Sequence, residues 1–502
     1  MVSISNFNSI TSRDGAFAAA IAICRESLLL CSMKQSHQSN AAMRFSICAI
    51  CQMLLAVAFS AEPIAAPIAV SGQSPFLDCP EVQSGHIQST VEPCVSVNPA
   101  DPRNIIAVWQ QDRLTDEGAL GIVAGVSLDG GLTWTNNVLH GLTPCSGGIY
   151  ERASDPWVTF ASNGDAYVSV NVFNLSDNLN AIVVLKSQDK GLSWGGVTTL
   201  IEDDTGPIDD KETITADPSD SDLVYAVWDR DGVPFFTRTT NAGATWESPR
   251  PVNTTVPLTK GSQIVVEANG TLLDFFSGCN PGSEILVVRS TDQGGTWSPP
   301  TIVATIVSVS LISPHSLTQI RTSASCNLFS VAQNKTSGAL YLVWADGRFN
   351  KTQYSDIAFT VSNDGGINWS NPVRINKTPG TNVNRQAFNP SIAVTADGGI
   401  GVTYYDFRNN RRVPAKDGLS RALTDYWLVR CTSPKPGRSR AWGHEIRITP
   451  ASFNIDNAPI TGGQIFLGDY EGMTASGSDF MLIFNEPTSS SSAAIFFDRV
   501  LR

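Results

Sequence analysis

The sequence has few of the residues on which several kinds of protein depend. Its 502 residues include five histidines, six methionines and only 34 lysines and arginines against 46 aspartates and glutamates, a formal net charge of −12. A surface that neutralises nucleic-acid phosphates is therefore not expected. Beyond residue 61 there is no Cys-x-x-Cys pair and no histidine at zinc spacing, which argues against a zinc site. We expect no cofactor, no metal and no nucleic-acid partner.

Long apolar runs are also scarce, and the clearest one lies near the N-terminus. Residues 47–59 are apolar, with Met43 and Arg44 before them and Ser60 and Ala61 after them. This run is short for a membrane span and is typical of a cleavable secretory signal. We interpret residues 1–61 as a gene-model extension plus a signal peptide that starts at Met43, and residues 62–502 as one domain. The protein is then secreted and has no membrane span in its mature form, whereas an uncleaved anchor is the alternative that the length disfavours.

Two further features favour the secretory pathway. Six cysteines lie beyond the signal segment, and in an oxidising compartment disulfides are the expected use for them, although their spacing does not reveal the pairing. Asn-x-Ser/Thr sequons, the acceptors of N-glycans, also occur in this part of the chain. They begin at Asn174, Asn253, Asn269, Asn334, Asn350, Asn368 and Asn376.

The sequence does contain an internal repeat. Five segments share the form Ser/Thr-x-Asp/Asn-x-Gly-x-x-Trp. In each, the acidic or amide side chain can bond backbone N–H groups of its own turn, the glycine can take a positive φ, and the tryptophan can pack beneath the turn. We predict five buried tryptophans. The segments are 127–134, 187–194, 239–246, 290–297 and 362–369.

These segments are Asp boxes, and on them the chain resembles the sialidase-like β-propeller superfamily. The resemblance implies an all-β fold. The boxes recur on average about every 59 residues, and 411 residues from position 92 onward make roughly seven such units. A sixth, degenerate unit spans residues 389–448, and residues 472–476, 479–486 and 493–500 read as strands of a seventh. We predict seven blades, with six as the alternative, and expect residues 68–76 to supply the outer strand that closes the ring.

The topology of such a blade predicts where function lies. An Asp box is the turn between the third and fourth strands, so it marks the face opposite the central funnel. Polar residues that follow second strands, or that begin first strands, should meet in that funnel. The repeated Asp–Arg pairs among them can equally be struts between blades. The candidate site residues are Arg113, Lys211, Glu212, Arg230, Arg348, Arg385, Tyr405, Asp406, Arg408 and Tyr470.

Sialidase chemistry itself is not indicated. Sialidases have an Arg-Ile-Pro motif early in the first blade, whereas here Arg374-Ile375-Asn376 lies far downstream. We therefore favour an enzyme that acts on an organic small molecule in the funnel. Secreted fungal hetero-Diels–Alderases of tropolone-sesquiterpenoid pathways are similar in general character and need oriented partners and donors rather than a nucleophile. The alternatives are a glycoside hydrolase using carboxylates such as Asp155, Glu212 or Asp406, and a non-catalytic glycan-binding propeller.

Overall fold

The computed structural model describes residues 66–80, 85–252, 255–279, 283–322, 328–351, 353–379, 386–410, 422–431, 433 and 435–501. Residues Ala66–Arg502 form one compact unit. The predicted leader (residues 1–61), Asn253 and Arg385 lie outside the described residues. No helix in the described part of the chain is long and apolar enough to cross a membrane.

The described chain is built from antiparallel sheets, which confirms the all-β prediction. Most of the sheets use strands that follow one another in the sequence. The four-stranded groups of the first half contain β2 (Thr90–Val97), β3 (Ile105–Arg113), β4 (Ala119–Ser127) and β5 (Thr135–Val138); β6 (Arg152–Phe160), β7 (Ala166–Phe173), β8 (Asn180–Ser187) and β9 (Thr198–Asp203); β10 (Asp209–Ala216), β11 (Val224–Arg230), β12 (Val233–Thr239) and β13 (Arg250–Pro251); and β14 (Thr259–Val266), β15 (Leu272–Gly278), β16 (Glu284–Ser290) and β17 (Thr301–Thr305). The first two groups are joined into one sheet, because β4 pairs with β6 at Ala119 and Ala153.

The second half continues this pattern and ends on a strand from the beginning of the chain. The predicted strands of the last unit are β30–β32, and β1 pairs with β32 at its outer edge. The sheets contain β19 (Phe329–Gln333), β20 (Leu340–Asp346), β21 (Asp356–Ser362) and β22 (Val373–Arg374); β23 (Ala387–Val394), β24 (Ile400–Asp406), β25 (Leu423–Cys431), β26 (Trp442–Arg447) and β27 (Phe453–Asn454); and β30 (Gly472–Ser476), β31 (Asp479–Ser489), β32 (Ser492–Val500) and β1 (Ile68–Ala69).

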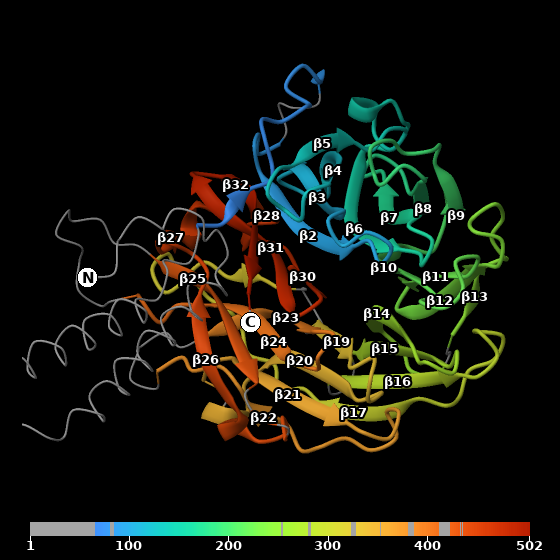
Figure 1. Cartoon of the computed structure of the whole chain (residues 1–502). Helices are drawn as coiled ribbons and strands as arrows, with labels where there is room; N and C mark the ends of the chain where they lie inside the picture. Colours follow the sequence, from blue (N-terminus) through green and yellow to red (C-terminus); the bar gives the residue numbers. More distant parts are fainter. Residues whose placement is uncertain are drawn as a thin grey trace, which may run out of the picture. The chain divides into compact units, whose positions relative to one another are not determined.

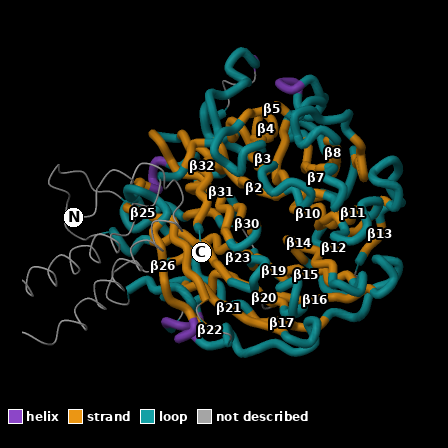
Figure 2. Tube along the Cα trace, viewed as in Figure 1, coloured by secondary structure: helices purple, strands orange, loops and turns teal. Residues whose placement is uncertain are grey.

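The first strands of these sheets lie next to one another. Contacts run from β2 to β6, β10, β14, β19, β23 and β30 in turn, and β30 contacts β2. Figure 1 shows the sheets placed around a common centre, with the red strands β30–β32 beside the blue strand β2. Figure 2 shows that the few helical segments lie in connecting loops. This arrangement delivers residues from distant parts of the sequence to one central region.

A small additional sheet lies among the connecting segments. It contains β18 (Ile320–Arg321), β29 (Gln464–Phe466) and β28 (Ile460–Thr461), with β18 and β29 parallel. One disulfide joins Cys79 to Cys145, and Cys279 is also disulfide-bonded. The expectation of disulfides is thereby confirmed, whereas Cys94 and Cys431 are free thiols.

The Asp boxes form the turns between third and fourth strands, as predicted. In the first box Asp129 accepts from the backbone N–H groups of Leu132 and Thr133, both at 2.9 Å. Hydrogen bonds, the side chain of Thr133 foremost, lower the pKa of Asp129 to about 2. Gly131 has φ 95°, and a Cβ there would overlap the Phe497 ring of the neighbouring sheet. The box glycine thus permits both the turn and the close approach of two sheets.

The tryptophans of the boxes are not fully buried, so that part of the prediction is wrong. All five are half-buried, with part of each ring packed against a core cluster. Three of these tryptophans contact an aromatic ring of the preceding sheet, because the Asp box lies at the edge of its sheet. The pairs are Trp134–Phe497, Trp297–Phe236 and Trp369–Phe275, with ring centroids 5.1, 5.4 and 6.0 Å apart. In the degenerate sixth unit, Trp442 takes the same position on Phe359 at 4.8 Å.

Replacing Trp297 by alanine should therefore cost less than the loss of a fully buried aromatic. Full burial is associated with about 3–5 kcal/mol, so we expect about 2 kcal/mol for this half-buried ring. Urea denaturation measures the difference. Leu132→Ala is the control because Leu132, in the exposed part of another box, is 70% exposed and should change stability by less than about 0.5 kcal/mol. Equal effects of the two substitutions would contradict the packing role of the tryptophan.

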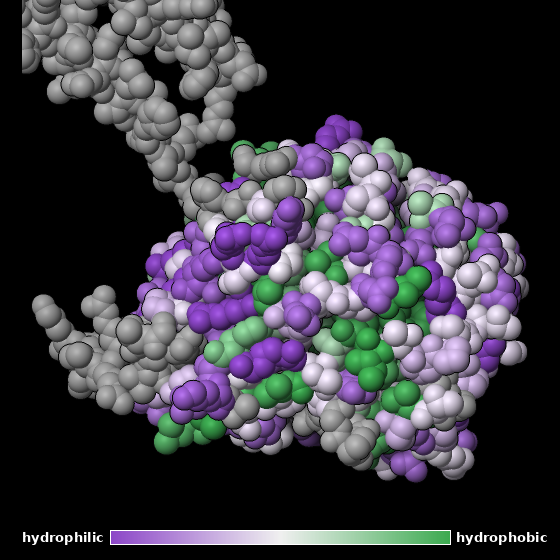
Figure 3. Space-filling view, turned by 90° about the horizontal axis from the view of Figure 1, so that it is seen from below, coloured by the Kyte–Doolittle hydropathy of each residue, from purple (hydrophilic) through white to green (hydrophobic). Residues whose placement is uncertain are grey.

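The surface is mixed in character. On the side of the molecule seen in Figure 3, small groups of apolar residues are separated by polar ones. The apolar cores lie instead between neighbouring sheets, in seven clusters within the described residues. The apolar packing that stabilises the fold is thus distributed between the sheets. The centre can therefore hold polar and charged residues.

Candidate functional site

Five of the seven first strands in the described residues carry a β-bulge at an equivalent place. The bulges interrupt the registers of β2, β6, β10, β14 and β23. A bulge redirects a side chain that would otherwise alternate across the sheet. Four of the five bulged residues are not glycine, and each costs on the order of 1–3 kcal/mol in this backbone region. The bulged residues are Glu92 (φ 54°), Asp155 (φ 50°), Lys211 (φ 56°), Gly261 (φ 75°) and Asn389 (φ 46°).

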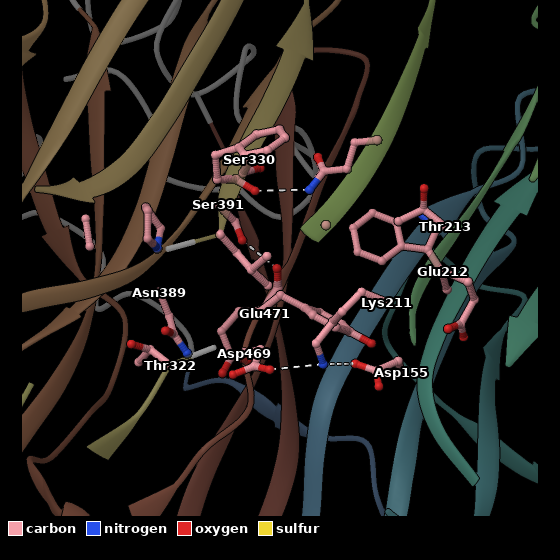
Figure 4. Close-up of a pocket in the computed structure, with 18 residues that line it drawn as sticks. Asp155, Lys211, Glu212, Thr213, Thr322, Ser330, Asn389, Ser391, Asp469 and Glu471 are labelled. Atoms are coloured by element: carbon pink, nitrogen blue, oxygen red, sulfur yellow. Dashed lines mark hydrogen bonds and ion pairs between the residues drawn. The ribbon is translucent and has the colours of Figure 1, made fainter. Parts of the chain in front are cut away.

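Three acidic side chains surround the Lys211 ammonium, Glu92 from β2, Asp155 from β6 and Asp469 from the segment that precedes β30. Its Nζ lies 2.5 Å from Oδ1 of Asp155, 3.0 Å from Oδ2 of Asp469 and 3.8 Å from Oε1 of Glu92, and Figure 4 shows the first two contacts. The Lys211 side chain is only 9% exposed. Burial opposes its charge, but the carboxylates, Asp155 first, raise the pKa of Lys211 well above its usual value. The lysine is therefore a fixed cation.

Another carboxyl group at the same cavity, that of Glu212, lacks partners within the described residues. Neither oxygen of Glu212 has a hydrogen-bond partner within the described residues, and this residue is 2% exposed. Burial, followed by the charge of Asp155, raises the pKa of Glu212 well above its usual value. Burial also raises the pKa of Glu471 well above its usual value, although hydrogen bonds from the Asn485 backbone N–H and the Tyr405 side chain act in the opposite direction. The cavity thus places a buried carboxyl group whose pKa is raised near an ion-paired carboxylate.

Aromatic and polar side chains complete the lining of this first cavity. Tyr470 and Trp157 meet edge to face with ring centroids 5.4 Å apart, and the Tyr470 hydroxyl donates to the carbonyl oxygen of Pro156 at 3.1 Å. Ser391 donates its hydroxyl to the Glu471 carbonyl oxygen. The lining residues are Asp155, Trp157, Lys211, Glu212, Thr213, Gly261, Gln263, Thr322, Leu328, Phe329, Ser330, Ala345, Asn389, Pro390, Ser391, Asp469, Tyr470 and Glu471.

A second cavity adjoins the first, because Asp155 and Lys211 line both. Its volume is about 210 Å³, against about 60 Å³ for the first. Arg113 lies here, with its guanidinium 4.5 Å from the centre of the Phe466 ring, and Arg321 lies over the same ring at 5.3 Å. Burial lowers the pKa of Arg113 from its usual value. This cavity combines cations with apolar side chains, including the partly exposed Leu175 and Ile208.

Glu92 gives the site a dependence on pH. Burial, followed by the charge of Asp155, raises its pKa from 4.5 to about 8. Because the pKa is raised in the folded protein, the protonated carboxyl stabilises the fold fully below about pH 4, and this contribution is lost as the pH rises through 8. We expect the unfolding temperature to fall between pH 5 and 9, and Glu92→Gln to make that fall shallower. Calorimetry across this range measures it.

Other buried carboxyl groups also lower the stability as the pH rises. Part of the decrease in unfolding temperature should therefore remain in Glu92→Gln. Burial raises the pKa of Asp229, Glu445 and Glu486 to about 7. Glu151→Gln is the control, since hydrogen bonds from Ser176 lower the pKa of Glu151 and its contribution does not change above pH 5. An alkaline slope that is the same in wild type and Glu92→Gln would contradict this assignment.

The arginines after other second strands are not brought to either cavity. Arg230 pairs with Asp203 and Asp209, and Arg348 lies 2.9 Å from Asp346. Each guanidinium binds a neighbouring carboxylate, because a buried acid, Asp209 for Arg230 and Asp346 for Arg348, lies close to it. The expected convergence of these two arginines on the funnel is wrong, and they act as struts.

The same correction applies to the sixth sheet. Arg408 pairs with Asp406 at 2.6 Å and with Glu445. Asp406 is buried and also accepts from the Thr378 hydroxyl at 2.5 Å. Tyr405 is fully buried in an apolar cluster, where its hydroxyl donates to the Asn485 carbonyl oxygen at 2.7 Å. None of the three lines either cavity.

One predicted sequon conflicts with the fold. Asn376 is 2% exposed, and its amide donates to Asp356 and to Thr378, both at 2.9 Å. A glycan on that nitrogen would break these bonds and has no space, so the prediction for Asn376 is wrong in the folded protein. Asn269 and Asn368 are exposed, and the sequons at Asn174, Asn334 and Asn350 are half-buried.

The structure therefore brings together Lys211, Glu212 and Tyr470 at the first cavity, with Arg113 at the second. Sequence reasoning missed Glu92 as a member of the cluster. A signal for it existed, since Glu92-Pro93 interrupts an apolar first strand in the same way as Asp155-Pro156 and Asn389-Pro390. A proline inside a strand pattern marks a bulge or an edge.

Comparison with known protein families agrees with the repeat. Residues 272–427 match the model of the BNR repeat-like domain, and this segment contains two of the five Asp boxes. This part of the chain is similar to BNR repeat-like domains, as the Asp boxes within it predict. The resemblance inferred from the five boxes is thus confirmed at the level of the superfamily. No curated protein matches the sequence significantly.

Solved structures with a similar arrangement share little sequence with this Asp-box protein. A protein of unknown function from Dyadobacter fermentans is 12% identical with a TM-score of 0.46, covering 88% of this chain and 99% of that one. The NanB sialidase of Streptococcus pneumoniae is 13% identical (TM-score 0.45, 68% of each chain). The α-L-arabinofuranosidase Arb93A of Fusarium graminearum is 11% identical (TM-score 0.45, 87% of this chain and 98% of that one). Similarities at this level carry no argument about activity.

Proposed function

We propose that the chain is a glycoside hydrolase whose chemistry takes place at the first cavity. The observation that carries this proposal is the unpartnered, buried Glu212 in the same cavity as the ion-paired Asp155. Glycoside hydrolysis uses two carboxyl groups, one protonated to assist the leaving group and one ionised to act as nucleophile or base. Two acids whose surroundings hold them in different protonation states are the usual sign of such a pair.

The roles follow from the contacts. Neither oxygen of Glu212 has a hydrogen-bond partner among the described side chains and burial raises its pKa well above its usual value, which favours the protonated form and gives it the role of general acid. Asp155 accepts from the Lys211 ammonium and is the ionised partner. Lys211 is a positioning residue that fixes the Asp155 carboxylate, because Asp469 and Glu92 hold the ammonium from other sides. Trp157 and Tyr470 offer ring surfaces against which a sugar can pack.

Hydrolysis of a panel of aryl glycosides tests this function. The panel should contain furanosides and pyranosides that are neutral, acidic or amino-substituted, with release of the aryl group measured and the anomeric form of the sugar followed by NMR. We expect cleavage of at least one class. Failure to cleave any member, in a preparation shown to be folded, would contradict the proposal.

A second candidate is the hetero-Diels–Alderase predicted from the sequence. The second cavity favours it, since Arg113 and Arg321 could donate to the oxygens of a quinone methide while Phe466 and Ile208 contact an apolar partner. Against it, six acidic side chains line that cavity beside three basic ones. Acceleration of such a cycloaddition by the purified protein, with no glycosidase activity, would favour this candidate.

The architecture and location complete the proposal. We infer seven blades closed by the pairing of β1 with β32, a count supported by the successive contacts of the first strands. We also propose that the protein is secreted after cleavage near residues 61–62 and that it carries N-glycans at exposed sequons. The disulfide between Cys79 and Cys145 supports an oxidising compartment.

A further inference from the structure

The first cavity has a charged side and an uncharged side. Lys211 and Glu212 of β10 lie on the charged side, whereas β14, β19 and β23 line the cavity with polar side chains that carry no charge. These three strands are neighbours, since β19 contacts both β14 and β23. Figure 4 shows their labelled residues apart from Lys211 and Glu212. We call this group the neutral side of the cavity, and its members are Gln263, Ser330, Asn389 and Ser391.

Two amide groups of the neutral side have a fixed orientation. Nδ2 of Asn389 donates to the carbonyl oxygen of Gly468 at 2.8 Å, and Nε2 of Gln263 donates to that of Phe329 at 3.0 Å. Because a carbonyl oxygen only accepts, each amide must turn its nitrogen to it and its own oxygen elsewhere. Within the described residues neither amide oxygen has a hydrogen-bond partner, and neither is shut off from solvent. Both are therefore oriented acceptors that remain unused.

The backbone of Asn389 explains how its amide reaches the cavity. Asn389 is one of the bulged residues and has φ 46°, and a bulge redirects a side chain that would otherwise alternate across the sheet. The residue is 6% exposed and lines the cavity. At the bulge of β14 the corresponding residue is Gly261, so the backbone conformation itself does not need an asparagine.

The charges of the cavity favour an uncharged ligand. Among the described residues that line it, Lys211 is the single cation, and its ammonium already contacts Asp155 and Asp469. The neutral side offers no counter-ion of either sign. An ionised group bound there would lose its water without gaining a partner, which costs free energy. A hydroxyl group can instead donate to an amide oxygen at no such cost.

We propose that Asn389 and Gln263 accept hydrogen bonds from hydroxyl groups of an uncharged sugar, so that the substrate of the first cavity is a neutral glycoside. The cleavage of that sugar rests on the proposed function, whereas the recognition of its hydroxyl groups rests on the two amides. Trp157 and Tyr470 add ring surfaces in the same cavity, against which the C–H groups of a sugar can pack.

An array of immobilised oligosaccharides tests this recognition without turnover. The array should hold neutral, uronic-acid, sialylated and de-N-acetylated amino-sugar oligosaccharides, and we expect the protein to bind at least one neutral series and no charged one. Asn389→Gly and Gln263→Met should each weaken that binding by about 2- to 10-fold, the usual contribution of one hydrogen bond between uncharged groups. Gln293→Gly is the control, because Gln293 also has a positive φ (57°) but lies in an exposed turn outside both cavities.

Monodeoxy analogues of the bound oligosaccharide separate contact with the ligand from an effect on the fold. At least one analogue should bind wild type about 2- to 10-fold more weakly than the parent. That analogue should lose nothing further in Asn389→Gly or in Gln263→Met, because the variant and the analogue remove the same hydrogen bond. The wild-type comparison applies even if neither variant folds.

The results that would overturn the inference differ from those that would refute the hydrolase. A preference for charged oligosaccharides, no binding to any neutral one, no weakening by any monodeoxy change, or unchanged binding by both folded variants would overturn it. A loss in both variants that is the same for the parent and for every analogue would do so too. Hydroxyl-dependent binding without cleavage would refute only the proposed function, and cleavage confined to charged glycosides would refute only the inference.

Discussion

Replacing Lys211 by methionine should lower the free energy of unfolding by about 3–5 kcal/mol. The substitution keeps most of the side-chain volume but leaves the buried carboxylates of Asp155 and Asp469 without their shared cation. Carboxylates in that position repel one another and have lost the water that would otherwise solvate them. Equilibrium urea denaturation of the variant and of wild type measures the loss.

Lys190→Met is the matched control. Lys190 also contacts a carboxylate, Asp101, at 3.0 Å, but its side chain is 50% exposed, so water and salt weaken the interaction. Its loss should cost less than about 1 kcal/mol. If Lys211→Met were as mild as the control, the carboxylates would not depend on the ammonium and the description of the cluster would be wrong.

Glu212→Gln should reduce kcat/KM for a glycoside with a poor leaving group by about 10²- to 10⁴-fold, the usual contribution of general acid catalysis. The amide keeps the shape of the side chain but has no proton to give. Because neither oxygen of Glu212 has a partner, the change should not disturb the fold. Steady-state kinetics and an unfolding measurement on the same preparation separate the two effects.

Asp274→Asn controls for the loss of a buried carboxyl as such. Asp274 is fully buried, burial raises its pKa well above its usual value, and it lines neither cavity. The rate should therefore be unchanged in this variant. A comparable loss of rate in both variants would show that the effect of Glu212→Gln is transmitted through the fold rather than through catalysis.

The repeat unit could be predicted from the sequence because its signals are local. An Asp box depends on a turn of eight residues, so the roles of Asp129 and Gly131 follow from the residue types and their spacing. The burial of the tryptophans could not be predicted in the same way. It depends on how closely the neighbouring sheet approaches, as the contact of Trp134 with Phe497 shows.

The candidate site could be predicted in part, for a related reason. Lys211 and Glu212 lie near the start of a first strand, where no other unit has a Lys–Glu pair, and both line the cavity. Arg230, Arg348 and Arg408 failed as site residues because each has an acid within reach in its own surroundings, as Arg230 has in Asp209. Sequence patterns give the position of a residue along a strand but not which partner is close enough to bind it.

The positive-φ bulges account for the part of the site that could not be predicted from the sequence. At Asp155 and Lys211 the backbone adopts a positive φ that non-glycine residues avoid, and this conformation turns both side chains toward the centre. In the local sequence, the proline that follows Glu92 and Asp155 is the signal that indicates this conformation. Strained residues of this kind are retained where the surrounding structure holds them and tend to occur at functional sites.

The most direct test of the acid–base assignment is the dependence of the Glu212→Gln rate on the leaving group. A nitrophenolate leaves readily without a proton, whereas a sugar or a simple alcohol must be protonated as it leaves. If Glu212 is the general acid, the variant should hydrolyse the nitrophenyl glycoside at a rate close to that of wild type and lose about 10²- to 10⁴-fold on the alkyl glycoside. An equal loss on both substrates, or no loss on either, would contradict the central claim that Glu212 donates the proton at this cavity.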